Sequence, residues 1–344
     1  MSTLSIIFVG FGNVGKALYK LLERKREILD EVYGFDYRIV GVATGRHGMA
    51  LDPSGLPMDL LLEAMNSHGS IAEFHRGPEI KDVFDFIRLS NADVMFENSP
   101  VSYKDGQPAI NHIRTALEFG MHAITANKGP VVHAHCELTD LAKQQGKRFM
   151  FESAVMDGAP IFSLFRGPLP AIELRGFTGI LNSCTNLLIG LMEEEKTFDE
   201  AVAYAQSIGI AETDPSGDID GWDAAIKVAA LSSVVMGVPL KPADVEREGI
   251  RSITPQMILD ARAAGERWKL VCTARRDGKG GIKASVKPQR VRPTSPLFSI
   301  NGTSSFVQFE TDVLPGLGIV EGDPSPDTTA YGLLADLINA VRGQ

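Results

Sequence analysis

The residues best suited to chemistry lie between positions 211 and 227, where five carboxylates and one lysine crowd a short stretch. Proline and glycine interrupt this stretch and predict a loop that leads into a helix beginning near Gly221. On that helix Asp223 and Lys227 are four residues apart, so their side chains share one face. Such a pair is usually a surface ion pair, but this helix is apolar around most of its circumference. At least one of the two charges is therefore expected at a buried or half-buried boundary, where it needs a partner.

The acidic side chains of this stretch indicate what kind of molecule a site there would bind. Gathered against one lysine, they would suit a small substrate that bears an ammonium group. The carboxylates expected to gather there are Glu212, Asp214, Asp218, Asp220 and Asp223.

A second pattern, near the N-terminus, predicts a dinucleotide-binding site. Leu4 to Val9 is rich in β-branched and aromatic residues and predicts a strand, and a helical apolar pattern follows Gly15. The G-x-G-x-x-G sequence between them allows a tight turn, close approach of a pyrophosphate and close packing of the helix, whose N-terminus faces the anion. The residues expected to border the cofactor are Gly10, Phe11, Gly12, Asn13, Val14 and Gly15. The alternative is a glycine-rich turn without a ligand, which the strand before it and the helix after it make less attractive.

The end of the second predicted strand bears on which dinucleotide is bound. NAD enzymes usually place a carboxylate there, but Tyr37 to Ala43 ends without one. Thr44 and Arg46 follow instead, where the 2′-phosphate of NADP would lie. We therefore expect a preference for NADP over NAD, the alternative being that Arg46 is solvated and takes no part.

Composition excludes several classes of protein. The 344 residues are 44% hydrophobic and 22% charged, with a net charge of −9, as in an ordinary soluble protein with two full cores. No basic stripe is present that could neutralise phosphates, so neither nucleic acid nor an anionic membrane is an expected partner. The chain starts directly with a predicted strand, and no apolar run approaches the ~18 residues of a membrane span. Three widely spaced cysteines without a C-x-x-C pair complete the expectation of a cytoplasmic protein with reduced thiols.

Strands and helices alternate through the first 150 residues, which predicts the α/β class. Residues 1–150 are expected to form a dinucleotide-binding domain built on a Rossmann-type doubly wound parallel sheet. Its later elements are expected to be strands at 93–97, 121–125 and 148–152 and helices at 108–119 and 134–145. Residues 48–77 are expected to be an irregular insertion with one short helix around 57–65.

Beyond Ala154 the pattern becomes α+β, which predicts a second domain over residues 151–314. The expected elements are a strand at 171–180, a helix opened by a capping box at 197–200 and ended at Gly209, and a hairpin of strands 268–274 and 281–286. A final helix at 328–341 follows a glycine-rich segment, and residues 315–344 are expected to complete the first domain.

These motifs together resemble the homoserine dehydrogenases, which interconvert L-aspartate 4-semialdehyde and L-homoserine with a nicotinamide cofactor in threonine, methionine and isoleucine biosynthesis. The resemblance covers nearly the whole chain. It implies a homodimer assembled through the second domain, by strands around 171–180 and 268–274. The motifs that carry it are Gly10-Phe-Gly-Asn-Val-Gly15, Thr125-Ala-Asn-Lys-Gly129, Glu152-Ser-Ala-Val-Met-Asp-Gly-Ala-Pro160, Gly209-Ile-Ala-Glu-Thr-Asp-Pro215 and Asp218-Ile-Asp-Gly-Trp-Asp-Ala-Ala-Ile-Lys227.

The resemblance implies roles for individual residues. Lys227 matches the lysine of proton transfer, and Asp223 matches the carboxylate that holds substrate beside it. Glu212 matches the glutamate that binds the substrate's amino group, and Asp218 is taken as a further substrate-binding carboxylate. Lys128 matches the lysine near the nicotinamide and the reacting oxygen. The chemistry agrees, because hydride reduction of an aldehyde builds negative charge on oxygen, which a positioned lysine can protonate.

A structural sodium ion is a further implication of the resemblance. Glu152, Val155 and Asp157 match a segment that holds this ion in some members of the family.

Two segments depart from the family's pattern. Asn182, Ser183 and Cys184 stand where the family usually has Asn-Gly-Thr, and as expected neighbours of the substrate's carboxylate they could reshape its contacts. The second is Phe96-Glu-Asn-Ser-Pro100, where the family tends to have Glu followed by Leu or Thr. Asn98 and Ser99 are expected to contact the cofactor, with Asn98 as a hydrogen-bonding group, and a simple turn at Pro100 is the alternative explanation.

We expect a small-molecule enzyme of this family without a regulatory tail. A related dehydrogenase of another hydroxy amino acid is the first alternative, because of Ser183 and Cys184. A non-catalytic dinucleotide-binding sensor is the second, although such a protein would be expected to have lost Lys128, Asp223 or Lys227.

Overall fold

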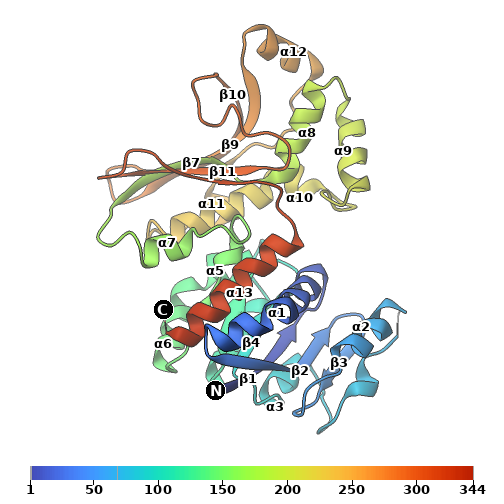
Figure 1. Ribbon diagram of the computed structural model, residues 1–344. Coiled ribbons are helices and arrows are strands. Elements are labelled where there is room, and N and C mark those ends of the chain that lie inside the picture. The colour runs from blue at the N-terminus through green and yellow to red at the C-terminus, as the bar shows by residue number, and fades with distance from the viewer. Residues whose placement is uncertain (1, 68, 344) are drawn as a thin grey trace. The chain divides into compact units, whose positions relative to one another are not determined.

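The computed structural model describes residues 2–67 and 69–343 (Figure 1). These residues form two compact units. The first contains the chain up to Pro160 together with the segment from Ser325 onward, and the second contains Ile161–Pro324. Within the described ranges, no helix is long and apolar enough to cross a membrane.

A mixed sheet lies at the centre of the first unit, with the strand order β3-β2-β1-β4-β5-β6. Its strands are β1 (Ser2–Val9), β2 (Phe35–Thr44), β3 (Gly48–Leu51), β4 (Val94–Glu97), β5 (His122–Thr125) and β6 (Phe149–Met150). All of them run parallel except the edge strand β3. The order reverses between β1 and β4, and ligands of such sheets bind beyond the carboxyl ends of the strands at this switch point. The expected doubly wound fold is confirmed.

Helices cover this sheet and supply most of its core. They are α1 (Asn13–Glu31), α2 (Met58–Asn66), α3 (Val83–Leu89), α4 (Ala109–Glu118), α5 (Lys128–His133), α6 (His135–Gln144) and α13 (Pro326–Arg342), with short 3-10 turns η1 (Ala72–Phe74) and η2 (Glu152–Ala154). The last helix lies beside the first, as Figure 1 shows. Leu18 and Leu22 of α1 and Leu333 and Leu337 of α13 are buried in one cluster with Phe8 of β1. This packing explains why the two ends of the chain belong to one unit.

The segment 48–77 corrects one expectation, since it contains a strand as well as the expected helix. β3 pairs antiparallel with the end of β2, from Gly41 opposite Leu51 to Thr44 opposite Gly48. The strand has only four residues, too few for an alternating pattern to be recognised, and it starts at a glycine with φ of +87°. Helix α2, at Met58–Asn66, agrees with the prediction.

The second unit is built on another mixed sheet, with the strand order β12-β11-β7-β9-β10-β8. Its strands are β7 (Leu174–Ile180), β8 (Glu246–Arg247), β9 (Arg267–Arg276), β10 (Ile282–Val291), β11 (Ser305–Thr311) and β12 (Leu317–Glu321). Its helices are α7 (Phe162–Arg166), α8 (Ser183–Glu193), α9 (Phe198–Ser207), α10 (Ser216–Ile219), α11 (Trp222–Val234) and α12 (Pro255–Ala263), with the 3-10 turn η3 (Pro242–Asp244). Helices α8 and α11 pack against β9.

Several local predictions for the second unit are confirmed. Thr197 and Glu200 form the capping box that opens α9, and β9 and β10 form the antiparallel hairpin. The segment 315–344 differs from expectation, because Leu317–Glu321 pairs with β11 in the second sheet. Gly316 and Gly318 lack the side chains whose alternation would have indicated this strand.

The order of the second sheet also corrects the argument for the expected dimer interface. Open sheet edges need covering, but β7 and β9, the strands named for the interface, are neighbours inside the sheet. The edges are β12 and β8.

A buried lysine fixes one end of this sheet to α8. The side chain of Lys269 in β9 is 2% exposed, and its Nζ donates to Asn186 Oδ1 at 2.9 Å and to the carbonyl of Ile300. Burial lowers the pKa of Lys269 to about 8. The amide of Asn186 in turn donates to the carbonyls of Gly302 and Ser304, so the loop before β11 is held against α8.

Candidate active site

The glycine turn after β1 has the geometry of a phosphate-binding loop. Gly10 has φ of +87°, and a Cβ there would lie 2.5 Å from the backbone of Asn98. A Cβ on Gly15 would lie 3.0 Å from the ring of Phe11, whereas one on Gly12 would meet nothing within 4 Å. Gly12 is also the N-cap of α1, whose first turn carries no acidic residue. The open space at Gly12, directly at a helix N-terminus, fits an anionic pyrophosphate.

The turn after β2 places the residues expected to select the coenzyme. Thr44 Oγ1 accepts from the amide of His47 at 2.8 Å and donates to the carbonyl of Gly48 at 3.2 Å, which closes the turn into β3. Arg46 is exposed in this turn, and none of the described residues pairs with its guanidinium. Thr44 therefore shapes the turn, while Arg46 is available to a ligand.

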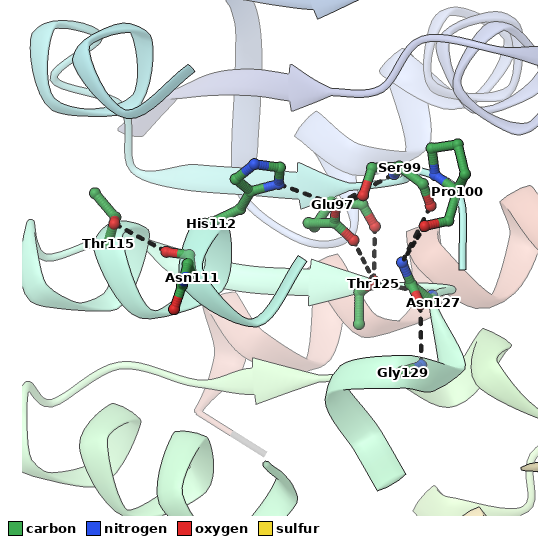
Figure 2. A network of polar contacts seen from close by, with 9 residues as sticks. All are labelled: Glu97, Ser99, Pro100, Asn111, His112, Thr115, Thr125, Asn127 and Gly129. Atoms are coloured by element: carbon green, nitrogen blue, oxygen red, sulfur yellow. Dashed lines mark hydrogen bonds and ion pairs between the residues drawn. The ribbon is translucent and has the colours of Figure 1, made fainter. Parts of the chain in front are cut away.

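A polar network joins the carboxyl ends of β4 and β5 (Figure 2). Thr125 Oγ1 donates to the carbonyl of Glu97 at 2.6 Å and accepts from the amide of Asn127 at 2.9 Å. Asn127 Nδ2 donates to the carbonyl of Ser99 at 3.1 Å, and Asn127 Oδ1 caps α5 by accepting from the amide of Gly129 at 2.9 Å. This network fixes the segment after β4 and the start of α5 together.

Asn98 and Lys128 occupy the two segments that this network holds. Both polar atoms of the Asn98 side chain are buried without a hydrogen-bond partner in the structure. A buried amide without hydrogen bonds lowers the stability of the fold unless a ligand supplies the missing partners. The position of this amide therefore fits the expected cofactor contact. Lys128 is the first residue of α5 and is half-buried.

In the second unit, the side chain of Asn182 brings two of the predicted carboxylates together. Its Nδ2 donates to Asp218 at 2.7 Å and to Asp223 Oδ2 at 2.9 Å. Its Oδ1 accepts from both the amide and the hydroxyl of Thr185, at 2.8 Å each. All four hydrogen-bonding positions of this amide are therefore used within the protein, and Asn182 joins the two carboxylates to the start of α8.

Lys227 completes this cluster, as the helical spacing predicted. Its Nζ lies 3.0 Å from Asp223 Oδ2 and donates to the carbonyl of Leu181 at 2.7 Å. The side chains of Lys227 and Asp223 are only 15% and 12% exposed. The pair is thus not a surface ion pair, because both partners lie at a largely desolvated boundary.

Ser183 and Cys184 begin α8 beside this cluster. Ser183 Oγ lies 3.2 Å from the hydroxyl of Ser305. Cys184 is buried, and burial, reinforced by the neighbouring Asp218 carboxylate, raises the pKa of its thiol. The thiol is therefore held neutral, which is typical of a small packed side chain rather than a nucleophile.

Three predicted carboxylates lie outside the cluster. Asp220 pairs with Arg251 at 2.5 Å, and Asp214 accepts from the amide of Ser216 at 3.1 Å in its own loop. Glu212 is exposed before α10.

The expected sodium site lies around η2. Glu152 and Val155 are buried, and Asp157 accepts from the hydroxyl of Thr328 at 2.7 Å. Among the described residues, no group of three or more His, Cys, Asp and Glu side chains is arranged to hold a metal ion. The sodium ion stays a prediction that depends on backbone carbonyls.

No expectation from the sequence included Glu97, His112 and Thr125 of the polar network in Figure 2. A carboxylate that ends a fully buried parallel strand is a usable signal, because such strands are otherwise apolar and their ends border the ligand. His112 gave no such signal, since it lies on α4, 15 positions after Glu97.

The sheet topology and the open glycine turn define a dinucleotide-binding protein, and the lysine held against a buried carboxylate is suited to a redox reaction that also moves a proton. Comparison with known proteins makes the assignment specific. Residues 160–338 match the homoserine dehydrogenase family, and residues 10–152 match the NAD binding domain of homoserine dehydrogenase. The chain belongs to the homoserine dehydrogenase family. It is an NAD(P)-dependent oxidoreductase that interconverts L-aspartate 4-semialdehyde and L-homoserine.

Two relatives match over almost their full length. The chain is 33% identical to the NAD(+)-dependent homoserine dehydrogenase of Pseudomonas canavaninivorans, over 98% of this chain and 96% of that protein. It is 35% identical to the homoserine dehydrogenase of Methanocaldococcus jannaschii, over 98% of both. A hyperthermophilic archaeal homoserine dehydrogenase solved in complex with NADPH superposes with a TM-score of 0.83 at 26% identity, covering 99% of this chain and 98% of the other. These matches favour an enzyme of this family over the two alternatives considered from the sequence.

A pair of glycine variants tests the phosphate loop. Gly12→Ala should fold with an unchanged melting temperature but raise the coenzyme KM by roughly 10- to 200-fold, because its Cβ fills the space left for the pyrophosphate. Gly10→Ala should instead destabilise the protein by roughly 1–3 kcal/mol, because its Cβ would overlap the backbone of Asn98. Thermal unfolding and steady-state kinetics measure both. Wild-type coenzyme KM in Gly12→Ala would contradict the proposed path of the pyrophosphate.

Proposed function

We propose that Lys227 exchanges the proton of the reacting oxygen in this homoserine dehydrogenase. The observation that supports this most strongly is the contact of its Nζ with Asp223 at 3.0 Å at a largely buried boundary. When bound, the dihydronicotinamide would supply the hydride that forms the new C–H bond at the aldehyde carbon. As that bond forms, the carbonyl π electrons move to oxygen, and the ammonium of Lys227 gives this oxygen a proton. In the oxidising direction the neutral amine takes the proton back.

Asp223 and Asp218 are proposed to orient the substrate. Together with Lys227 they carry a net negative charge, which suits the ammonium group of homoserine. Glu212, on its exposed loop, is proposed as a further contact of that ammonium group. Ser183 differs from the family's usual residue and lies on the first turn of α8, where it is proposed to change the contact with the substrate's carboxylate. Cys184 also differs, but its thiol is packed away from solvent.

The first unit is proposed to hold the coenzyme at the carboxyl ends of the strands of its sheet. The glycine turn and the N-terminus of α1 bind the pyrophosphate, and Phe11, Asn13 and Val14 border it. Asn98, with its orphaned amide, and Ser99 contact the coenzyme after β4. Lys128, at the start of α5, is proposed to lie near the nicotinamide. A sodium ion at Glu152, Val155 and Asp157 would be structural and would take no part in these steps.

Coenzyme choice is proposed to favour NADP. Arg46 is exposed and without a partner among the described residues, at the end of a strand that offers no carboxylate to a ribose. One relative is solved with NADPH and another is NAD(+)-dependent, so the family accommodates both.

Replacing Arg46 tests this preference. Arg46→Ala should raise the KM for NADP by about tenfold or more and leave that for NAD nearly unchanged, because a charge-assisted contact to phosphate is worth roughly 1.5–3 kcal/mol. Rates of L-homoserine oxidation with each coenzyme give the values. Arg38→Ala, at an exposed arginine within β2, is the matched control and should alter neither KM. A wild-type enzyme that uses NAD better than NADP would show that the turn after β2 has been misinterpreted.

A homodimer formed through the second unit is also proposed. Its sheet has open edges at β12 and β8, and Val313, Leu314 and Val320 expose large apolar side chains around β12. Light scattering should give twice the 37.2 kDa of one chain. The mass of a single chain at micromolar concentration would contradict the dimer.

The cellular setting is proposed to be cytoplasmic, in threonine, methionine and isoleucine biosynthesis. All three cysteines, Cys136, Cys184 and Cys272, are free in the structure, as expected of a reducing compartment. Cell fractionation tests the location, and recovery of the protein outside the cytoplasm would contradict it.

A further inference from the structure

Glu97 is a buried carboxylate at the carboxyl end of β4, beside the proposed coenzyme contacts, and the proposed proton transfer does not involve it. It ends β4 and is 0% exposed. Oε1 accepts from the amide of Ser99 at 3.2 Å and from its hydroxyl, and it lies 3.4 Å from His112 Nδ1. Oε2 lies 3.3 Å from Thr125 Oγ1 (Figure 2). Four groups from three different segments therefore converge on one side chain.

The position of Glu97 makes packing alone a poor explanation for a charged residue. The preceding strand residues Val94, Met95 and Phe96 are apolar and fully buried, so an apolar residue would continue the strand. Burying a carboxylate costs free energy unless hydrogen bonds compensate for the lost water. The hydrogen bonds that compensate for this cost also hold their partners in place.

Those hydrogen bonds hold the two segments that carry the proposed coenzyme contacts. Asn98 lies between Glu97 and Ser99, whose amide and hydroxyl Glu97 binds directly. Ser99 in turn accepts from Asn127 Nδ2, and Asn127 is the N-cap of the helix that starts with Lys128. The backbone of Asn98 also abuts Gly10 so closely that no Cβ would fit between them. Glu97 thus fixes the segment of Asn98 and the helix of Lys128 against the glycine turn.

We propose that Glu97 is a positioning residue for hydride transfer, which sets the Asn98 amide and the start of α5 in the geometry that the nicotinamide requires. This rests on the proposed coenzyme contacts of Asn98 and Lys128. Hydride transfer depends steeply on the distance and angle between the two carbons, so an error of about 1 Å in that geometry can cost roughly 100-fold in rate. The pyrophosphate contacts lie on the glycine turn, so they should survive the loss of Glu97.

The test compares Glu97→Ala and Glu97→Gln with the wild type in the intact enzyme. Glu97→Ala should lower kcat by roughly 100-fold, change the coenzyme KM only a few-fold, and increase the primary deuterium isotope effect measured with coenzyme deuterated at C4. Glu97→Gln keeps the length and an acceptor oxygen and should recover much of the lost rate. The rise in melting temperature on adding coenzyme should persist in both variants.

Ser90→Ala is the matched control. Ser90 is buried just before the other end of β4, and its hydroxyl donates to the carbonyl of Ile87 at 2.8 Å. This variant should lower the melting temperature but leave kcat and the isotope effect unchanged. If Glu97→Ala behaves in the same way, Glu97 is only structural and the proposal is wrong. Should Glu97→Ala fail to fold, Ser99→Ala removes one of the same hydrogen bonds and carries the same readouts.

Asn98→Ala and Lys128→Ala separate this proposal from the function on which it rests. If both leave kcat and coenzyme KM at wild-type values, the proposed coenzyme contacts are wrong, and so is positioning through them. If both impair the enzyme while Glu97→Ala does not, the contacts stand and the role of Glu97 alone is refuted.

Discussion

The charged cluster of the second unit depends on one amide group, that of Asn182. Two unit charges about 5 Å apart repel by roughly 3 kcal/mol at the effective dielectric of a protein. Asn182 Nδ2 offsets such repulsion between Asp218 and Asp223 by donating to both. Lys227 places its positive charge next to the same Asp223 oxygen that Asn182 binds. Because Asn182 is also the N-cap of α8, the position of the cluster is tied to the start of that helix.

The first unit likewise relies on a buried side chain, Glu97, next to the glycine turn. Its sheet ends in a turn that must leave space for an anion, and Gly12 leaves that space while Gly10 and Gly15 bring the neighbouring backbone and helix close. Glu97 holds the segment next to this turn by hydrogen bonds to Ser99 and through Thr125. In both units a buried side chain at or just after the carboxyl end of a strand uses its hydrogen bonds to fix the residues around it. Rigid support of this kind is what keeps reacting groups within a fraction of an ångström.

The sequence predicted those features whose physics is local. The glycine turn, the α9 capping box and the Asp223–Lys227 pair each depend on residues within four or five positions of one another, so spacing alone indicated them. Strands β3 and β12 were missed because each is short and begins at or contains glycine, which removes the alternating pattern. The Glu97 network and the bridging role of Asn182 join residues 15 to 41 positions apart. No pattern within one sequence reports which distant segments the fold brings together, so these could not be predicted.

Lys227 is proposed to carry the proton of the reaction. The most direct test is kcat of Lys227→Ala with L-homoserine, with Lys269→Met as a control that removes a buried lysine on β9 of the same unit. We expect kcat of Lys227→Ala to fall by at least about 100-fold, since general acid and base catalysis contributes 10²- to 10⁴-fold. The coenzyme should still raise the melting temperature of this variant. Lys269→Met should keep wild-type kcat. A Lys227→Ala enzyme that retains half of the wild-type kcat would remove Lys227 from the mechanism.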